Sequence, residues 1–409
     1  MDFFNYENFE LFAEKVPLKI IADRFGTPLY VYSKNTLVKH LRAFKDAFKG
    51  SKALVCFAYK ANCNRAILKI IKDAGFGADC VSGGELLMAK KIGIPGGQIV
   101  FNGNGKTEEE IKLALKMKVK MFNVDSVQEL FTISRLAAML KVRPNISFRV
   151  NPEIEIPTHP HIATALRGSK FGIPMGEAFA AYKLAKSLGP VAVSGVHMHI
   201  GSQITAVEPF KKALEKLFVL SGKLRKAGIK IKYVNVGGGL GVKYHGELPA
   251  ALKKYANVIL SHSKRIAPNV ILEPGRVIIA NTAVLVTKVI ANKTAGGRKF
   301  IVADCGMNDL LRPSMYGAYH EVEPVRIFEN RAKEFFTVAG PVCESGDIIA
   351  KKRFLQNAFP GEMLAVRGVG AYGYSMSSNY NLRPRPAEVL VDGKKFFEIR
   401  KREKIKDLI

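Results

Sequence analysis

The chain has 409 residues, a length that favours two domains over a single ordinary core. Its composition, 48% hydrophobic and 24% charged, is globular and excludes an intrinsically disordered protein. Long apolar runs such as residues 280–290 are interrupted by polar residues, here Asn281, Thr282, Thr287 and Lys288. Because a membrane span requires about 20 apolar residues, we expect no membrane association.

The N-terminal residues and the cysteines both favour a cytoplasmic location. The segment MDFFNYE lacks a basic stretch followed by an apolar one, so we expect no secretory signal. The five cysteines are odd in number, scattered, and form no C-x-x-C pair. They therefore indicate neither a disulfide framework nor a zinc finger, and reduced thiols in a reducing compartment fit best.

The formal net charge of +28 comes from 63 basic and 35 acidic residues. Nucleic-acid binding is one interpretation of this excess. The basic residues are spread along the whole chain, however, and the run at residues 400–404 has no interleaved aromatics for stacking on bases. We therefore expect no nucleic-acid partner. A general basic bias, or a surface that attracts an anionic substrate, explains the charge equally well.

The middle of the chain alternates short apolar strands with amphipathic helices. Eight strands are predicted at residues 53–59, 78–81, 98–101, 120–124, 145–150, 194–200, 232–236 and 269–273. Helical patterns lie between them at residues 64–73, 83–92, 107–117, 126–140, 174–188, 207–227 and 249–262. Thr107 with Glu110, and Ser126 with Glu129, have capping-box spacing. This alternation predicts an α/β protein with a (β/α)₈ barrel, and a doubly wound open sheet is the alternative.

After Gly275 the pattern changes to strand-like segments with few helices between them. These segments are residues 277–290, 299–303, 335–338, 363–369 and 387–391. They predict a separate C-terminal β-sheet or β-barrel domain, and the strand-like residues 28–32 are expected to pair into it. The predicted division is a barrel domain at residues 34–282 and a β domain formed by residues 1–33 and 283–409.

The active site of a (β/α)₈ barrel lies at the C-terminal ends of its strands, where this chain carries polar or flexible residues. They are Lys60, Asp79, Ser82, Asn102, Asn123, Asn151, His199, the glycines at 237–239 and Glu273. Each alone is readily explained as a loop or capping residue. A partly desolvated lysine such as Lys60, at the end of a buried strand, is suited to form a Schiff base with an aldehyde cofactor.

Three further clusters are consistent with a cofactor site. The glycine run at residues 237–241 follows a strand and resembles a phosphate cradle, although a simple tight turn explains it too. His197 and His199 are two residues apart, which on a strand places them on one face. A metal site, a ring packed on a cofactor and an ordinary buried histidine all remain open there. Glu273 and Arg276 place a carboxylate and a guanidinium close together.

Taken as a set, these residues resemble the diaminopimelate decarboxylases of the alanine-racemase-like fold. The matching segments are YKAN at 59–62, SGGE at 82–85, HMHIGSQ at 197–203, GGGLG at 237–241, EPGR at 273–276, GMNDLLRPSMY at 306–316, CESGD at 343–347 and GAYGYSMSSNYN at 370–381. They run in order through nearly the whole chain, and the later ones are long enough to be highly specific. The resemblance implies decarboxylation of meso-2,6-diaminopimelate to L-lysine and CO2, the last step of lysine biosynthesis, with pyridoxal 5'-phosphate as cofactor and no metal.

The resemblance also implies a role for each matching residue. Lys60 would hold the cofactor covalently, His199 would stack on its ring and Glu273 would pair with its pyridine nitrogen. Its phosphate would be bound by Ser202, Gly239, Tyr372 and the Pro274–Gly275–Arg276 segment. The substrate would be bound by Arg276, Arg312, Tyr316, Glu344 and Tyr372, and Cys343 would be the acid that protonates the α-carbon. Cys343 and Glu344 would come from the partner subunit, which implies a homodimer with active sites at its interface.

The residue chemistry is consistent with these implied roles. A carboxylate such as Glu273 keeps the ring nitrogen protonated and so favours the electron sink that decarboxylation needs. Arginines suit the distal carboxylate of the substrate, and Glu344 suits its distal ammonium. A thiol such as that of Cys343 is a proton donor of suitable strength at neutral pH.

Three alternatives remain at the level of sequence. The first is a decarboxylase of ornithine, arginine or carboxynorspermidine on the same fold; ornithine and arginine lack the distal carboxylate that Arg312 would bind. The second is a single-barrel cofactor carrier, which would lack the β domain. The third is a nucleic-acid-binding protein, supported by charge alone. We also expect residues 152–171, with His159 and His161, to close over the substrate.

Overall fold

The computed structural model describes residues 3–155 and 168–409, which form two compact units. The barrel unit comprises Arg42–Gly241 and Leu248–Arg276, and the β unit comprises Met1–Leu41, Val242–Glu247 and Val277–Ile409. The domain boundaries that we predicted at residues 33/34 and 282/283 remain a prediction.

A closed parallel barrel forms the core of the first unit. Its eight strands are β5 (Ala53–Ala58), β6 (Gly77–Cys80), β7 (Ile99–Phe101), β8 (Met121–Val124), β9 (Asn145–Asn151), β11 (Ala192–His197), β12 (Tyr233–Asn235) and β13 (Asn269–Leu272). They pair in this order, and β13 pairs with β5, so the sheet has no open edge. Closure confirms the predicted (β/α)₈ barrel and excludes the doubly wound open sheet. The short strand β10 (Ile173–Pro174) pairs with β9 outside this ring.

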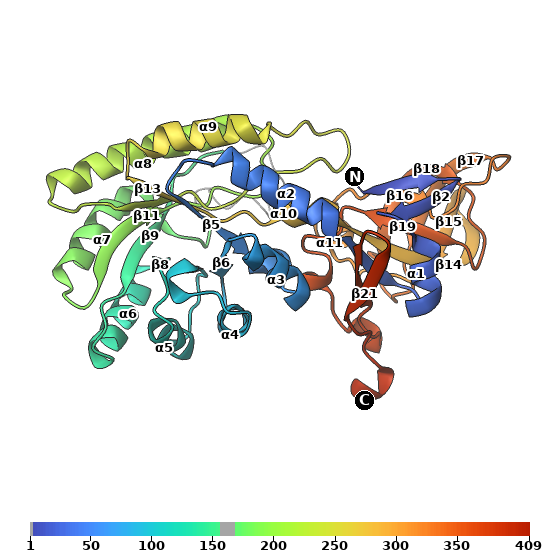
Figure 1. Cartoon of the computed structure of the whole chain (residues 1–409), viewed down its shortest axis with the longest axis horizontal. Coiled ribbons are helices and arrows are strands. Elements are labelled where there is room, and N and C mark those ends of the chain that lie inside the picture. Colours follow the sequence, from blue (N-terminus) through green and yellow to red (C-terminus); the bar gives the residue numbers. More distant parts are fainter. Residues whose placement is uncertain (1–2, 156–167) are drawn as a thin grey trace. The chain divides into compact units, whose positions relative to one another are not determined.

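The helices of the barrel unit lie outside its strands (Figure 1). They are α3 (Arg65–Asp73), α4 (Gly83–Lys91), α5 (Glu108–Lys116), α6 (Val127–Met139), α7 (Met175–Ser187), α8 (Glu208–Lys226) and α9 (Leu252–Ser263), preceded along the chain by α2 (Lys34–Ala47). Thr107 forms the predicted capping box, because its hydroxyl accepts from Glu110 and the Glu110 carboxylate accepts from the Thr107 backbone. At α6 the Ser126 hydroxyl caps Glu129 as predicted, but the Glu129 carboxylate binds Lys106 and the backbone of Asp125 instead. The second hydrogen bond of the capping box, from the Ser126 backbone to the Glu129 carboxylate, is therefore absent, because that carboxylate pairs with the buried Lys106 ammonium.

The β unit is built on a mixed sheet. Its strands are β4 (Leu29–Ser33), β14 (Ala283–Ala295), β15 (Arg298–Ala303), β16 (Val322–Pro324), β17 (Lys333–Ala339), β18 (Ile348–Gln356), β19 (Met363–Arg367), β20 (Ala387–Asp392) and β21 (Lys395–Arg400). The predicted pairing of the early strand is confirmed, because β4 lies between β14 and β20. A small sheet of β1 (Phe4–Glu7), β2 (Glu10–Ala13) and β3 (Val16–Pro17), together with α1 (Leu18–Phe25), packs its apolar residues into the same core.

The start of the predicted strand at 277–290 is wrong. The chain forms α10 (Arg276–Ile279) and a 3₁₀ turn (Ala280–Thr282) before β14 begins at Ala283. Ile278, Ile279 and Ala280 are buried, but their carbonyls are not bound in a strand ladder: Thr282 Oγ1 donates to Ile279 O, and Gly370 N from a distant loop donates to Ala280 O. An apolar run shows burial, and periodicity alone cannot separate a buried helical turn from a strand.

Within the described part of the chain, no helix is long and apolar enough to cross a bilayer.

Candidate active site

Lys60 lies in a 3₁₀ turn, Tyr59–Ala61, directly after β5. Its ammonium forms an ion pair with Asp79 at the end of β6, with Nζ 2.7 Å from Oδ2. The Asp79 side chain is fully buried, whereas 37% of the Lys60 side chain is exposed. Burial raises the pKa of Asp79, and the Lys60 charge opposes that rise. The strand end therefore presents an amine held in place by a buried acid.

Glu273 follows β13, the neighbour of β5 in the barrel, and is buried. Its Oε1 atom accepts hydrogen bonds from three side-chain amides at strand ends. The donors are Asn102 at 2.8 Å, Asn123 at 3.2 Å and Asn235 at 2.6 Å. Asn102 also donates to Asp79 Oδ1 at 2.6 Å, so one network joins Glu273 to the ion pair of Lys60.

The electrostatics of this network keep Glu273 ionised. Burial alone would raise the pKa of Glu273, but His197, Lys60 and the hydrogen bond from Asn102 outweigh it and lower the pKa well below its usual value. His197 Nε2 lies 3.6 Å from Glu273 Oε2. The barrel thus holds a fixed negative charge where the sequence predicts a partner for a pyridine nitrogen.

The two histidines do not share one strand face, contrary to the expectation from their spacing. Strand β11 ends at His197, so His199 lies in the following loop, where strand alternation no longer applies. His199 Nδ1 accepts a hydrogen bond from the backbone N–H of Gly238 at 3.2 Å. Burial, Arg149 and Lys60 lower the pKa of His199 well below its usual value, so its ring is neutral. Among the described residues, no cluster of three potential ligands gathers around a metal position.

Three loops of the barrel unit carry the predicted phosphate-binding residues other than Tyr372. Arg276, after β13, donates to Ser202 Oγ from Nη2 at 2.9 Å and from Nε at 3.3 Å. Gly239, after β12, has a φ of +103°, and a Cβ there would lie 2.4 Å from the carbonyl oxygen of Gly201. The glycine is therefore required for the loop after β12 to pack against the loop after β11. Pro274 and Gly275 connect Glu273 to Arg276 and are buried.

The remaining predicted residues lie in the β unit. Arg312 and Tyr316 begin and end the short helix α11 (Arg312–Tyr316), and Arg312 is buried. Ser314 of this helix donates from Oγ to Gly346 O at 2.7 Å, which joins α11 to the turn that contains Cys343 and Glu344.

Cys343, Glu344 and Tyr372 occupy loops of the β unit. Cys343 and Glu344 are exposed in the single chain, and Cys343 N donates to Asn381 Oδ1 at 2.9 Å. Asp347 stabilises their turn, because its carboxylate accepts from Val342 N at 2.7 Å and Met307 N at 2.6 Å. Tyr372 has a φ of +59°, an uncommon conformation for a tyrosine that marks a constrained loop.

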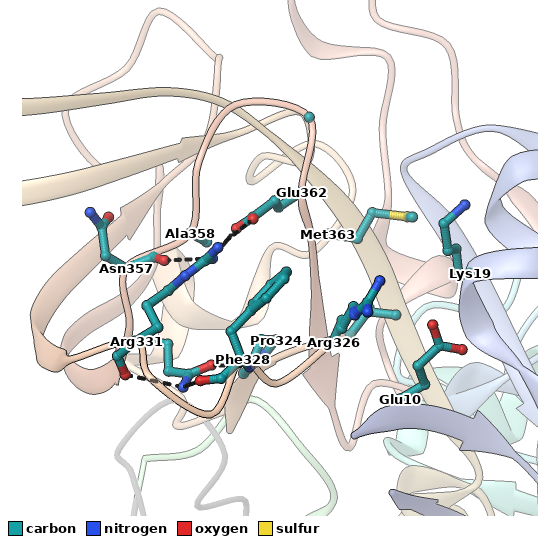
Figure 2. A pocket seen from close by; sticks show the side chains of 13 residues that line it. Glu10, Lys19, Pro324, Arg326, Phe328, Arg331, Asn357, Ala358, Glu362 and Met363 are labelled. Carbon is teal, nitrogen blue, oxygen red and sulfur yellow. Dashed lines mark hydrogen bonds and ion pairs between the residues drawn. The ribbon is translucent and has the colours of Figure 1, made fainter. Parts of the chain in front are cut away.

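The β unit also contains a cavity of about 200 Å³ beside β16 and β19 (Figure 2). Two of its charged residues are paired: Arg331 binds both carboxylate oxygens of Glu362, and its Cζ atom lies 3.8 Å from the Phe328 ring centroid. The predicted site residues do not line it. We therefore assign it no role in the chemistry.

Several residues around Glu273 received no role from the sequence: Asp79, Asn102, Asn123, Asn235 and His197. Three of them, Asp79, Asn102 and Asn123, are polar residues at predicted strand ends, and that position is the signal that would have identified them. The predicted closing loop at 152–171 lies largely outside the described residues, including His159 and His161.

The barrel residues fit pyridoxal phosphate. Lys60 supplies the amine and ionised Glu273 suits a protonated ring nitrogen. Arg276 and Ser202 are hydrogen-bonded to each other, and the loop of Gly239 packs against Gly201 in the loop that carries Ser202. This donor set matches an anionic phosphate at one end and a basic ring nitrogen at the other.

Comparisons with known proteins agree with this fit. A family profile described as "Pyridoxal-dependent decarboxylase, pyridoxal binding domain" matches residues 34–280. Diaminopimelate decarboxylase from Aquifex aeolicus is 45% identical over 402 residues, covering 98% of this chain and 95% of that protein. The Vibrio cholerae enzyme of the same name is 46% identical over 410 residues, covering 100% of this chain and 98% of that protein. The structure of diaminopimelate decarboxylase from M. jannaschii in complex with L-lysine has 40% identity and a TM-score of 0.94, and it covers 100% of this chain and 96% of that chain. This chain belongs to the diaminopimelate decarboxylases, a family of pyridoxal-dependent decarboxylases.

Proposed function

We propose that this chain removes one carboxylate of meso-2,6-diaminopimelate as CO2 and releases L-lysine, with pyridoxal phosphate held by Lys60. The observation that carries the proposal is the network at the adjacent ends of β5 and β13. There, the Lys60 amine and the ionised Glu273 carboxylate are joined through Asp79 and Asn102. Family membership and the bound lysine of the M. jannaschii relative support the choice of substrate.

In this proposal the barrel residues bind and orient the cofactor. When bound, its protonated ring supplies an electron sink for the electron pair left at the α-carbon. Glu273, fixed by three amides, would keep a proton on the ring nitrogen. The neutral ring of His199 would pack against the cofactor ring, and its phosphate would be held by Gly239, Ser202, Tyr372 and the Pro274–Gly275–Arg276 segment.

The β unit would supply most of the substrate-binding residues and the acid. Arg312, Tyr316, Tyr372 and Arg276 would bind the substrate, and Glu344 would bind its distal ammonium. Cys343 would donate its Sγ proton to the α-carbon after CO2 leaves. Its exposure in the single chain is consistent with a role in the partner's site, so we propose a homodimer with active sites at the interface. All five cysteines are free, which is consistent with a cytoplasmic location.

The cofactor assignment is tested by supplying pyridoxal phosphate to the purified protein and recording its absorbance. We expect the band of lysine-bound cofactor in the wild type and its loss in Lys60→Ala. The absence of any bound chromophore in the wild type would overturn the proposal.

The substrate assignment is tested by CO2 release from meso-diaminopimelate, L-ornithine and L-arginine, each supplied separately. We expect turnover of meso-diaminopimelate to dominate. Faster turnover of ornithine would leave the family placement intact and refute the proposed substrate.

The role of Cys343 is tested with Cys343→Ala. We expect normal cofactor absorbance but a kcat lower by roughly 10²–10⁴-fold, the usual contribution of a general acid. Ser345→Ala, two residues along the same exposed turn, is the matched control and should retain activity. Wild-type turnover by Cys343→Ala would refute the acid role.

A further inference from the structure

His320 is a buried histidine of the β unit that directly contacts Arg312. Its Nε2 atom lies 2.8 Å from Arg312 Nη1, and its Nδ1 atom lies 2.8 Å from the backbone oxygen of Arg367 in β19. The backbone oxygen of His320 also accepts from Arg353 Nη2 at 3.4 Å. The imidazole ring thus bridges the short helix α11 and the sheet.

These two partners determine the protonation state of the ring. A guanidinium has N–H donors and no acceptor, so His320 Nε2 must be unprotonated to accept from Arg312. A backbone carbonyl only accepts, so His320 Nδ1 must carry the proton. Both ring nitrogens are therefore satisfied by the neutral Nδ1–H tautomer, and His320 accepts a hydrogen bond from Arg312 without adding a second positive charge beside it.

Tyr244 contacts the same guanidinium through its aromatic face. The Arg312 Cζ atom lies 4.8 Å from the Tyr244 ring centroid, within cation–π range. The Tyr244 and His320 rings are 5.4 Å apart at an interplanar angle of 72°, an edge-to-face packing. The hydrogen bond to His320 therefore sets the direction of one N–H group of Arg312, and contact with the Tyr244 ring restricts the position of the guanidinium plane.

This arrangement matters because an arginine side chain is long and flexible. Recognition of a carboxylate by the planar guanidinium fork depends on its orientation, and orienting it in advance reduces the entropy lost on binding. A histidine that only filled core volume would not need to accept from the charged end of Arg312.

We propose that His320 and Tyr244 are positioning residues that orient Arg312 toward the distal carboxylate of the substrate and so set the preference for ligands that carry it. This inference rests on the proposed function of Arg312. It predicts a selective effect, because only ligands with that carboxylate depend on the orientation of the guanidinium.

The test compares two ligands of the holoenzyme that differ by one carboxylate. Decarboxylation of one end of meso-diaminopimelate leaves L-lysine, which retains the carboxylate of the unreacted end; 1,5-diaminopentane has the same chain without it. Dissociation constants for both are measured by titrating the absorbance of the bound cofactor.

The matched variants are His320→Asn and His320→Gln. The shorter asparagine amide can retain the bond to Arg367 O but cannot reach Arg312, whereas glutamine has the reach to restore an acceptor there. We expect His320→Asn to raise the dissociation constant of L-lysine about tenfold, the scale of one hydrogen bond to a charged group. The dissociation constant of 1,5-diaminopentane should change by less than about twofold. His320→Gln should recover most of the L-lysine affinity.

Tyr244→Leu provides an independent variant that leaves His320 intact. We expect the same selective loss, on the order of a fewfold, from removal of a cation–π contact. Thermal unfolding of each variant shows whether it is folded, and if His320→Asn does not fold, Tyr244→Leu and His320→Gln decide the question.

Arg312→Gln separates failure of the inference from failure of the proposed function. If Arg312→Gln leaves the preference for L-lysine over 1,5-diaminopentane unchanged, the proposed role of Arg312 is wrong and the inference falls with it. If Arg312→Gln abolishes that preference while the His320 and Tyr244 variants keep it, only the inference is overturned. Equal weakening of both ligands by His320→Asn would likewise overturn the positioning role, because it would show a general structural effect.

Discussion

The two carboxylate oxygens of Glu273 have different surroundings. Oε1 accepts from three asparagine amides, whereas Oε2 faces His197 at 3.6 Å. Hydrogen bonds to an ionised carboxylate stabilise the charged form and outweigh the cost of burial when several converge on one group. Together with His197 and Lys60, which contribute most to lowering its pKa, these hydrogen bonds keep Glu273 ionised.

Replacing Glu273 with Gln should separate cofactor binding from catalysis. The amide can still accept at one oxygen, so we expect Glu273→Gln to bind cofactor at Lys60. Its kcat should fall by roughly 10²–10³-fold, because the fixed charge near the reacting system is lost. Absorbance and CO2 release measure the two effects. Glu177→Gln, at an exposed position in α7, is the control; an unchanged kcat in Glu273→Gln would refute the role.

Asp309 is a second buried carboxylate, here with a pKa in the physiological range. Burial raises the pKa of Asp309 to about 7, although a hydrogen bond from Gly306 N opposes the rise. The folded state therefore retains this proton at pH values where the unfolded chain, with a pKa of about 3.9, has lost it. Because the folded state then binds more protons, the contribution of Asp309 makes stability fall as pH rises from about 4 to about 7.

Asp309→Asn should remove this contribution. We expect its free energy of unfolding, relative to that of the wild type, to increase between about pH 4 and pH 7 and to level off above that range. Urea unfolding at several pH values measures the difference. Asp407→Asn makes the same substitution at an exposed position, and its free energy of unfolding should depend on pH as that of the wild type does. If the free energy of unfolding of Asp309→Asn showed the same pH dependence as that of the wild type, burial would not be raising the pKa of Asp309.

At the scale of elements, the loop after β12 is constrained by close backbone approach. A Cβ on Gly238 would lie 2.2 Å from the carbonyl oxygen of Glu273. Gly237 N also donates to Asn235 Oδ1 at 2.9 Å, so the loop is connected to the amide network around Glu273. The glycine run is therefore required by packing, whatever it binds.

Gly238→Ala should accordingly be destabilising by about 1–3 kcal/mol, the usual cost of overpacking a rigid site, and should weaken cofactor binding. Gly222→Ala is the matched control, because Gly222 lies within α8 and a Cβ there would have no atom within 4 Å. That substitution should stabilise by about 0.5–1 kcal/mol, as expected for alanine in a helix. Urea unfolding distinguishes the two, and equal stabilities would contradict the close approach at Gly238.

The predicted strands and helices of the barrel were confirmed because each has a strong local signal. The barrel strands are short apolar runs, and α5 begins at a capping box that the spacing of Thr107 and Glu110 predicts. The edge strand β21 lacked such a signal, since it carries Lys395, Glu398 and Arg400. Edge strands commonly carry charges that discourage further pairing. Such charges interrupt the apolar pattern by which a strand is predicted from sequence.

At the scale of the whole molecule, the proposed dimer can be tested by mixing two inactive variants. Lys60→Ala removes the residue that holds the cofactor, and Cys343→Ala removes the proposed acid. If each site combines Lys60 of one subunit with Cys343 of the other, a hybrid dimer has one doubly altered site and one intact site.

Random exchange of subunits makes about half of the dimers hybrid, so an equal mixture should regain about a quarter of wild-type activity. CO2 release from meso-diaminopimelate measures the recovery, and each variant alone is the control. No recovery after verified subunit exchange would place Lys60 and Cys343 of one chain in the same site.

The sequence by itself determined the fold class, the strand ends that carry polar residues and the family, because these depend on local periodicity and on motifs that are contiguous in the chain. Only the tertiary structure decided which polar groups meet. Asn102, Asn123 and Asn235 converge on Glu273 because barrel closure brings distant strand ends together. His320 acquires its tautomer from Arg312 and from the backbone of Arg367, 47 residues away. Partners of this kind are set by three-dimensional packing, which sequence spacing does not encode.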